Sequence, residues 1–262
     1  MEVITSKDSR KFKELLRLTA KKYRDREGRF IAESPNVIGE AVSQYPELVE
    51  HVFALEGSGY ESFTEDTVTL TEQLFSRISD QVASQGLIAV IRKPDRGEND
   101  SSLARYADEG NVIVLDRLQD PGNIGTILRT AEGAGVKAAV FIKGTCDPFS
   151  PKVVRACAGS ILRVPMLFFE SAESFIASAG KSGFRLVVTD VEHGTPYYSA
   201  GLSDEGKHIA LVIGNEGRGV SETFRNAADI RVNIPMAGKL ESLNASVAAS
   251  LLMYEMGRPG VK

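Results

Sequence analysis

The chain has 262 residues, 42% of them hydrophobic and 25% charged, with a net charge of −4 at pH 7. This is an ordinary globular composition, and the length suggests two domains, each with enough apolar residues for a core. The two cysteines, Cys146 and Cys157, form no CxxC motif, which argues against a disulfide scaffold or a zinc site. There is no secretory leader pattern and no apolar run of about 18 residues, so we expect no membrane association and a cytoplasmic location.

The charge is unevenly distributed along the chain. Residues 1–30 contain ten lysines and arginines and five acidic residues, a local balance of +5 that leaves −9 for the remainder. A basic segment on an acidic body favours an anionic partner such as nucleic acid. The alternative is a solvated amphipathic helix, with its lysines facing water and helical spacing of Phe12, Leu15, Leu16, Thr19 and Tyr23.

The first part of the chain is expected to form a small α/β domain over residues 1–92. After the basic helix, the pattern predicts strands at 29–33, 49–55 and 87–92 and a helix at 35–44. Residues 93–102 have the composition of a loop, and we predict a linker over 93–108.

The remainder, residues 109–262, alternates apolar runs with helix-length segments. Start and stop signals for helices occur at Ser150-Pro151, Gly133 and Gly257. This alternation predicts the α/β class, with a mainly parallel sheet and helices on both faces. The predicted strands are 111–115, 138–142, 161–168, 184–189, 208–213 and 230–234.

Three clusters of small and polar residues each follow one of these apolar runs. Their sequences are DPGNIGTILRT at 120–130, IGNEGRGVS at 213–221 and IPMAGKLESLNAS at 234–246. Each cluster is expected where the chain leaves the carboxyl edge of the sheet. Ligands bind at that edge in open α/β sheets, so the clusters predict one site.

The first cluster carries Asn123 and Arg129, which lie six residues apart across a helix start and can project toward one pocket. A dinucleotide fold would need GxGxxG directly after the strand and an acidic residue about 20 residues later. The glycines here fall as Gly122-Asn-Ile-Gly125, which disfavours a nicotinamide enzyme. The simplest alternative makes Arg129 an ordinary surface arginine.

The second and third clusters suit a nucleoside ligand. The residues from Gly214 to Gly217 follow an apolar strand, so their backbone groups point outward, where an adenine or a ribose can bond to them. Ser242 is predicted to cap a helix whose inward stripe is Leu243, Val247 and Leu251. Alternatively, Ser242 merely caps that helix and Asn244 merely faces solvent.

In order, content and spacing, the clusters resemble motifs 1, 2 and 3 of the SpoU (TrmH-like) family of RNA ribose 2′-O-methyltransferases, in the SPOUT superfamily. The resemblance covers about residues 110–256, and a weaker one covers 1–90, where Phe30-Ile31-Ala32-Glu33 looks like the opening of the family's RNA-binding domain. It implies a deep trefoil knot in the segment bearing motifs 2 and 3. It also implies a homodimer through helices near 120–133 and 242–256, with each site completed by the partner subunit.

The resemblance implies S-adenosylmethionine as the cofactor, which needs no metal. The substrate would be structured RNA, ribosomal more often than transfer RNA. Two other classes stay open: a non-catalytic RNA-binding protein that retains the fold, and a small-molecule α/β enzyme with a nucleotide cofactor. The matching cofactor positions are Gly214, Ile234, Leu243, Thr189, Ile213 and Met236, and the matching catalytic positions are Arg129, Asn123, Glu216, Ser242 and Asn244.

Overall fold

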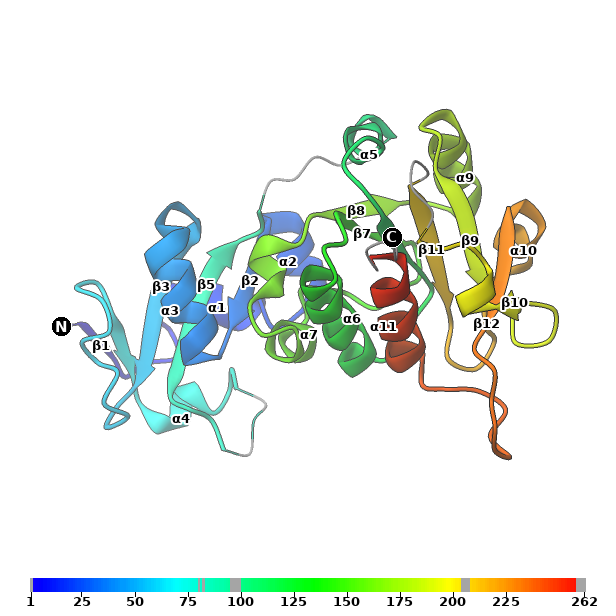
Figure 1. Ribbon diagram of the computed structural model, residues 1–262. Coiled ribbons are helices and arrows are strands. Elements are labelled where there is room, and N and C mark those ends of the chain that lie inside the picture. Colours follow the sequence, from blue (N-terminus) through cyan, green and yellow to red (C-terminus); the bar gives the residue numbers. More distant parts are fainter. Residues whose placement is uncertain (1, 80, 82, 95–99, 204–207, 258–262) are drawn as a thin grey trace. The chain divides into compact units, whose positions relative to one another are not determined.

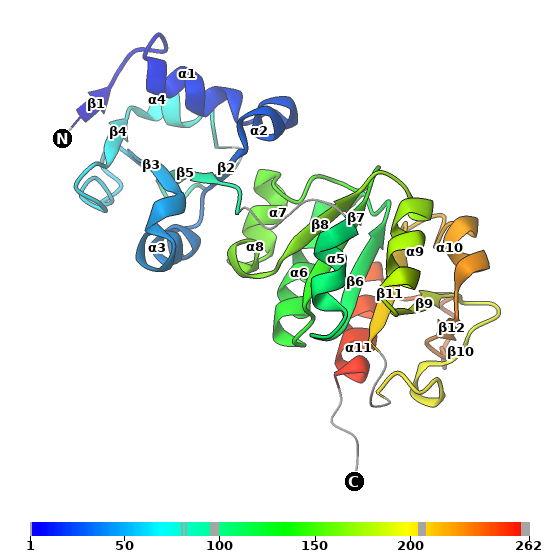
Figure 2. The same ribbon diagram turned by 90° about the horizontal axis from the view of Figure 1, so that it is seen from above.

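The computed structural model describes residues 2–79, 81, 83–94, 100–203 and 208–257 (Figures 1 and 2). The chain divides into two compact units, Met1–Asp95 with Asp147–Leu162, and Arg96–Cys146 with Arg163–Lys262. Residues 147–162 thus pack with the first unit, although they lie in the sequence of the second predicted domain. Residues 95–99 of the predicted linker lie outside the described residues.

The first unit is built on a mixed five-stranded sheet of order β1-β4-β3-β5-β2, in which β5 runs antiparallel to both of its neighbours. The predicted helix at 35–44 and the predicted strands at 29–33, 49–55 and 87–92 are confirmed. The elements are β1 (Glu2–Ile4), α1 (Arg10–Arg17), α2 (Lys21–Glu27), β2 (Arg29–Ala32), α3 (Pro35–Gln44), η1 (Pro46–Leu48), β3 (Val49–Leu55), β4 (Val68–Leu70), α4 (Glu72–Phe75), β5 (Leu87–Arg92), α7 (Pro151–Ala156) and, at the unit boundary, α8 (Ser160–Arg163).

The single basic helix expected near the N-terminus is instead two helices, α1 and α2. The hydroxyl of Thr19 donates to the carbonyl of Leu16 at 2.8 Å, and Ala20 is extended, so the first helix ends there. Phe12 and Leu15 point into the core as predicted, but Leu18 takes the next inward position and Thr19 is exposed. The predicted stripe was therefore wrong beyond residue 16.

Residues 147–162 are fastened to the first unit by a buried ion pair. Arg24 donates to Asp147 Oδ2 from Nη2 at 2.7 Å and from Nε at 3.1 Å, and the two side chains are 5% and 8% exposed. The Phe149 ring packs 5.3 Å from the Phe30 ring, and the Lys93 ammonium lies 4.6 Å from the Phe149 centroid. Charge and packing together make this segment part of the first unit.

The second unit contains a seven-stranded sheet of order β10-β12-β9-β11-β6-β7-β8, and every pairing in it is parallel. The predicted α/β class and parallel sheet are confirmed. The elements are α5 (Asp100–Tyr106), β6 (Val112–Asp116), α6 (Pro121–Gly133), β7 (Ala138–Ile142), β8 (Met166–Phe169), α9 (Ala172–Lys181), β9 (Arg185–Thr189), β10 (Thr195–Pro196), η2 (Tyr197–Ser199), β11 (Ile209–Gly214), α10 (Glu222–Ala227), β12 (Ile230–Asn233) and α11 (Ala245–Met256).

Helices cover both faces of this sheet (Figures 1 and 2). On one face, Leu103 of α5, Phe175 of α9 and Phe224 of α10 join a core cluster with strand residues such as Val114 and Val212. On the other face α6 and α11 lie side by side, joined by a 3.1 Å hydrogen bond between the hydroxyls of Ser250 and Thr130. None of the helices that the structure describes is long and apolar enough to span a bilayer.

One predicted strand of this unit was partly wrong. Ile161 and Leu162 lie in the short helix α8, and the strand predicted at 161–168 begins only at Met166. A short apolar run does not by itself distinguish a buried helix from a buried strand.

Candidate active site

The three clusters meet at the carboxyl edge of the parallel sheet. Strands β12, β9, β11 and β6 are consecutive neighbours, with Gly214 opposite Asp116 and Val232 opposite Thr189. The structure therefore brings together the ends of all the strands that carry predicted site residues.

The first cluster begins with a helix cap. Asp120 Oδ1 accepts the backbone N–H of Asn123 at 2.8 Å, and Pro121 occupies the first turn, where its missing N–H costs nothing. This cap fixes the start of α6 and leaves the Asn123 side chain only 7% exposed. Asp120 was not among the predicted site residues, although Asp-Pro before a helical pattern is a recognisable start signal.

A chain of side-chain hydrogen bonds links the three clusters. Asn123 donates from Nδ2 to Glu216 Oε1 at 3.1 Å and accepts on Oδ1 from Asn244 Nδ2 at 3.0 Å. Three of the predicted catalytic residues thus lie in direct contact, although the paired residues are 93 and 121 positions apart in the sequence.

Glu216 is held by backbone donors as well as by Asn123. Its Oε1 also accepts the N–H of Asp120, and its Oε2 accepts the N–H of Gln119, both at 3.1 Å. Partial burial alone would raise the pKa of Glu216, but hydrogen bonds from its own backbone, Asn123, Asp120 and Gln119 outweigh burial and lower it. The side chain is therefore an ionised clamp on the loop that precedes α6.

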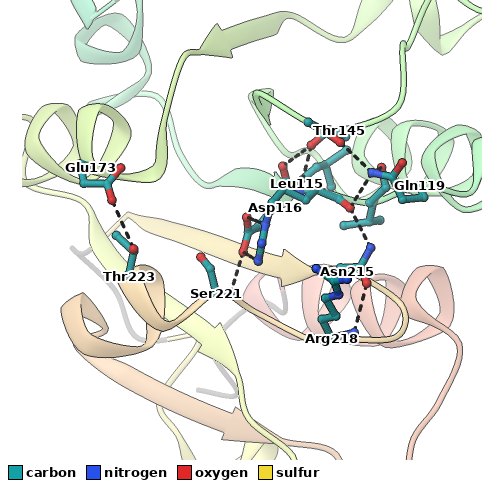
Figure 3. A network of polar contacts seen from close by, with 12 residues as sticks. Leu115, Asp116, Gln119, Thr145, Glu173, Asn215, Arg218, Ser221 and Thr223 are labelled. Atoms are coloured by element: carbon teal, nitrogen blue, oxygen red, sulfur yellow. Dashed lines mark hydrogen bonds and ion pairs between the residues drawn. The ribbon is translucent and has the colours of Figure 1, made fainter.

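The turn after β11 is shaped by Asn215. Its Oδ1 accepts the N–H groups of Gly217 and Arg218, each at 3.1 Å, and its Nδ2 donates to the carbonyl of Arg117 at 3.0 Å (Figure 3). At Gly214 a Cβ atom would lie 2.1 Å from the backbone nitrogen of Val220. Glycine is thus required at 214 by the close return of its own turn.

Asp116 and its neighbours, which were not among the predicted site residues, form the base of this edge (Figure 3). Asp116 is 1% exposed, and its Oδ2 accepts the N–H of Ser221 at 2.7 Å while Oδ1 accepts Arg117 Nε at 2.9 Å. The hydroxyl of Thr145 bonds to the backbone of residues Leu115 and Arg117. An aspartate directly after an apolar strand was the available signal.

The third cluster corrects the predicted helix start. Asn244, not Ser242, is the N-cap of α11, because its Oδ1 accepts the N–H groups of Ser246 at 2.9 Å and Val247 at 3.3 Å. Ser242 lies exposed in the preceding loop. Asn244 therefore both starts α11 and bonds to Asn123.

The predicted inward stripe of α11 was also wrong. Val247 and Leu251 are 47% and 41% exposed, and Tyr254 on the same face is 59% exposed. The buried side of α11 consists of Ser246, Ala249, Leu252, Met253 and Met256. The apolar stripe is real, but it lies on the outer face of the helix.

Arg129 lies exposed on α6 and makes no hydrogen bond or ion pair with any residue that the structure describes. The Asn244–Asn123–Glu216 chain does not include it. Helix α6 thus carries one member of the fixed polar chain, Asn123, and an exposed arginine with no partner among the described residues.

The cofactor positions suit a nucleoside with polar ends. Thr189, Ile213 and Ile234 lie at three adjacent strand ends, and Met236 and Leu243 in the loop between β12 and α11 are partly buried. Next to Ile234, the Oδ1 atom of Asn233 is buried and has no partner among the described residues, so it suits a ligand N–H or hydroxyl. Among the residues that the structure describes, no group of three or more His, Cys, Asp or Glu is placed to hold a metal ion.

Comparisons with known proteins agree with this geometry. Residues 110–254 match the SpoU rRNA methylase family, and residues 9–89 match an MRM3-like substrate binding domain. The 23S rRNA (guanosine(2553)-2′-O)-methyltransferase RlmP of Bacillus subtilis is 30% identical over 98% of this chain and 99% of its own length.

Two similar solved structures contain the methyl donor. The AdoMet-bound rRNA methyltransferase of Sinorhizobium meliloti has a TM-score of 0.81 at 26% identity and covers 97% of both chains. The SpoU methyltransferase AviRb of Streptomyces viridochromogenes, in complex with AdoMet, has a TM-score of 0.77 at 26% identity over 95% of this chain and 98% of its own. The resemblance carried by the three motifs is confirmed: this chain belongs to the SpoU rRNA methylase family and is an S-adenosylmethionine-dependent RNA methyltransferase.

Proposed function

We propose that this protein methylates a ribose 2′-hydroxyl in ribosomal RNA, with 23S rRNA as the first substrate to test. The observation that carries the proposal is the Asn244–Asn123–Glu216 chain, which joins all three motifs at the edge where the cofactor positions lie. The full-length similarity to a 23S rRNA 2′-O-methyltransferase supports the choice of substrate.

S-adenosylmethionine, when bound, supplies a methyl group activated on a sulfonium. The protein has to align the 2′-hydroxyl with that methyl group and accommodate the proton that leaves the hydroxyl. Arg129 stays protonated, so it is a poor base, and we assign it to holding the adjacent RNA phosphate and stabilising the developing alkoxide. The adjacent RNA phosphate then accepts the proton that leaves the 2′-hydroxyl and passes it to water.

Glu216 has a different role in this proposal. Its carboxylate accepts hydrogen bonds from Asn123 and from two backbone N–H groups before α6, which suits a group that orders motif 1. Asn123 and Asn244 extend that order to α11. We also keep the family's assignment of Ser242 as a catalytic residue and the family's trefoil knot in the segment bearing motifs 2 and 3. The assigned cofactor-binding positions remain Gly214, Ile234, Leu243, Thr189, Ile213 and Met236.

We also propose that the active form is a symmetric homodimer. Val247, Leu251 and Tyr254 follow the i, i+4, i+7 spacing of one helix face and leave an apolar stripe exposed on α11. The adjacent helix α6 carries the exposed Arg129, so a second copy on this face would bury the stripe and complete the site. Leu251→Asp should then give a monomer in sedimentation analysis, with S-adenosylmethionine binding or activity impaired. A wild-type monomer that turns over at micromolar concentration contradicts the dimer.

The first unit is assigned to RNA binding, supported by the match of residues 9–89 to a substrate binding domain. Because residues 147–162 pack with that unit, cutting the chain near residue 92 would expose their buried face. Substitutions are therefore a cleaner test of RNA binding than truncation. With ribosomal RNA as substrate, the cytoplasm remains the expected location.

The decisive experiment is methyl transfer to RNA from cells that lack the gene. Purified protein and S-adenosylmethionine are incubated with deproteinised 23S, 16S and transfer RNA, and 2′-O-methyl sites are mapped. We expect one new site in 23S rRNA, and cofactor binding by calorimetry without RNA or metal. A new site only in transfer RNA would overturn the substrate assignment. Cofactor-independent RNA binding with no methyl transfer would favour a non-catalytic protein.

A further inference from the structure

Two arginines outside the assigned site residues, Arg117 and Arg218, lie at the same edge of the sheet as the motifs. Arg117 directly follows β6, and Arg218 lies in the turn that follows β11. These two strands are paired, with Asp116 opposite Gly214. Both arginines therefore lie just beyond the ends of paired strands, next to the predicted cofactor and catalytic positions.

The backbone of Arg117 is held in an unusual conformation. Its φ of 61° lies in the left-handed region, which is unfavourable for a residue with a side chain. Three side chains hold it there: Thr145 Oγ1 accepts its N–H at 3.0 Å, and its carbonyl accepts from Asn215 Nδ2 and Gln119 Nε2, each at 3.0 Å. A glycine would adopt this conformation without strain, so the presence of arginine indicates a use for its side chain.

The guanidinium of Arg117 is held in one orientation, but some of its N–H donors remain available. Its Nε donates to Asp116 Oδ1 at 2.9 Å and its Nη2 to Oδ2 at 3.4 Å, and Asp116 is almost completely buried. Nη1 has no partner among the residues that the structure describes, and 39% of the side chain is exposed. A planar guanidinium fixed on one side by a carboxylate can donate its remaining N–H groups to a phosphate.

Arg218 is anchored through its backbone. The N–H of Arg218 donates to Asn215 Oδ1 at 3.1 Å, so the same amide side chain holds Arg218 and, through Nδ2, Arg117 (Figure 3). The Arg218 side chain is exposed and forms no hydrogen bond or ion pair with described residues. Asn215 thus places two arginines at one edge.

The negative charge at this edge explains why arginines are needed to bind RNA there. Asp116, Asp120 and Glu216 are carboxylates that would repel a phosphodiester. We propose that Arg117 and Arg218 bind backbone phosphates of the substrate RNA next to the methylated nucleotide, a role that rests on the proposed RNA methylation. Such contacts set the register of the RNA without reading its bases.

The test uses three variants, Arg117→Gly, Arg218→Ala and the combination of these two substitutions. Lys181→Ala is the control. Lys181 is a matched control, because it is an exposed cation at the end of α9. The next strand, β9, begins shortly after it, so Lys181 lies near the amino edge of the sheet, opposite the site. Glycine suits the backbone at 117 but leaves Asp116 without its cation, whereas Arg218→Ala removes no side-chain hydrogen bond or ion pair with described residues, so at least the Arg218 variant stays folded. The measurements are KM for RNA, kcat, the salt dependence of RNA binding and the Kd for S-adenosylmethionine.

We expect each substitution to raise KM for RNA about tenfold and to lower the salt slope by about one, with the Kd for S-adenosylmethionine unchanged. Lys181→Ala should match the wild type. If the wild type methylates RNA but both single variants keep its KM and salt slope, the inference is wrong and the proposed function stands. If the wild type binds S-adenosylmethionine but methylates no RNA, the proposed function fails and the inference with it.

Discussion

The two units hold their positive charge in different ways. In residues 2–30 every carboxylate forms an ion pair with a lysine or arginine side chain, so many of the positive charges in this segment have a nearby negative charge. At the carboxyl edge of the seven-stranded sheet, by contrast, Arg129 and Arg218 face no carboxylate partner among the described residues. The formal charge of a segment is therefore a poor guide to the charge available to a ligand. The N-terminal pairs are Lys11 with Glu2, Lys13 with Asp8, Arg10 with Glu14, Lys21 with Asp25, and Arg26 and Arg29 with Glu27.

The largest expected effect is on the buried pair of the first unit. Arg24→Met leaves Asp147 buried without its cation and removes the donor to the carbonyls of Leu18 and Thr19. We expect a loss of about 3–5 kcal/mol in the free energy of unfolding, measured by urea denaturation. Lys22→Met, an exposed neighbour, should change it by less than about 0.5 kcal/mol.

A double variant sharpens this test. Arg24→Met combined with Asp147→Leu removes both charges and should recover most of the lost stability, since an apolar pair can replace a buried ion pair. If Arg24→Met costs no more than its exposed neighbour, the pair is not what fastens residues 147–162.

The next largest effect is expected on the methyl-transfer rate, from substitution of Arg129 in the second unit. Arg129→Ala should slow single-turnover methyl transfer by about 10²–10³-fold, with unchanged cofactor affinity and stability, because Arg129 bonds to nothing described in the chain. Arg129→Lys should restore little, since a point charge cannot reproduce the planar fork. Full single-turnover activity in Arg129→Ala would remove this residue from the catalytic set.

A smaller effect concerns Glu216, whose charge is compensated by N–H groups. Because its pKa in the fold is below the ordinary value of 4.5, its contribution to stability is complete above that value and is lost as pH falls through the lowered pKa. Wild type should therefore exceed Glu216→Gln in stability at neutral pH, and the difference should shrink below pH 4.5. Thermal melts of both proteins across pH check this, and a difference that grows on acidification contradicts it.

The smallest effect is expected from exposed cations of the first unit. Arg17 and Lys22 make no ion pair with described residues, whereas Lys13 pairs with Asp8 at 2.8 Å. Arg17→Gln and Lys22→Gln should each lower the salt slope of RNA binding by about one, and Lys13→Gln by less. Equal slopes for all three variants would mean that local pairing does not decide which cations meet RNA.

Sequence patterns identified most of the longer strands and the sheet edge, because runs rich in Val, Ile and Leu that are bounded by small and polar residues favour buried strands. They missed the short strands β1, β4 and β10. They failed where two structures suit the same residues. Ile161 and Leu162 are apolar enough for either a strand or a helix, and α8 took them. On α11, spacing found the stripe of Val247 and Leu251 but could not show which side of the helix the sheet would cover.

The candidate site divides in the same way. Motif resemblance singled out Asn123, Glu216 and Asn244, and the structure joins them through hydrogen bonds. Sequence reasoning gave the cap of α11 to Ser242, since serine and asparagine are both good caps and the two lie only two residues apart. Arg117 escaped notice, because its unusual backbone depends on contacts with residues 28 and 98 positions away.

The ion pair between Arg24 and Asp147 also sets an order of events during synthesis. Domains near the N-terminus usually fold as soon as they leave the ribosome. Here Arg24 waits for a partner made 123 residues later, after strands β6 and β7 of the other unit have already emerged. The nascent chain must therefore carry a first unit in which Arg24 still lacks its carboxylate partner through the translation of nearly half the protein.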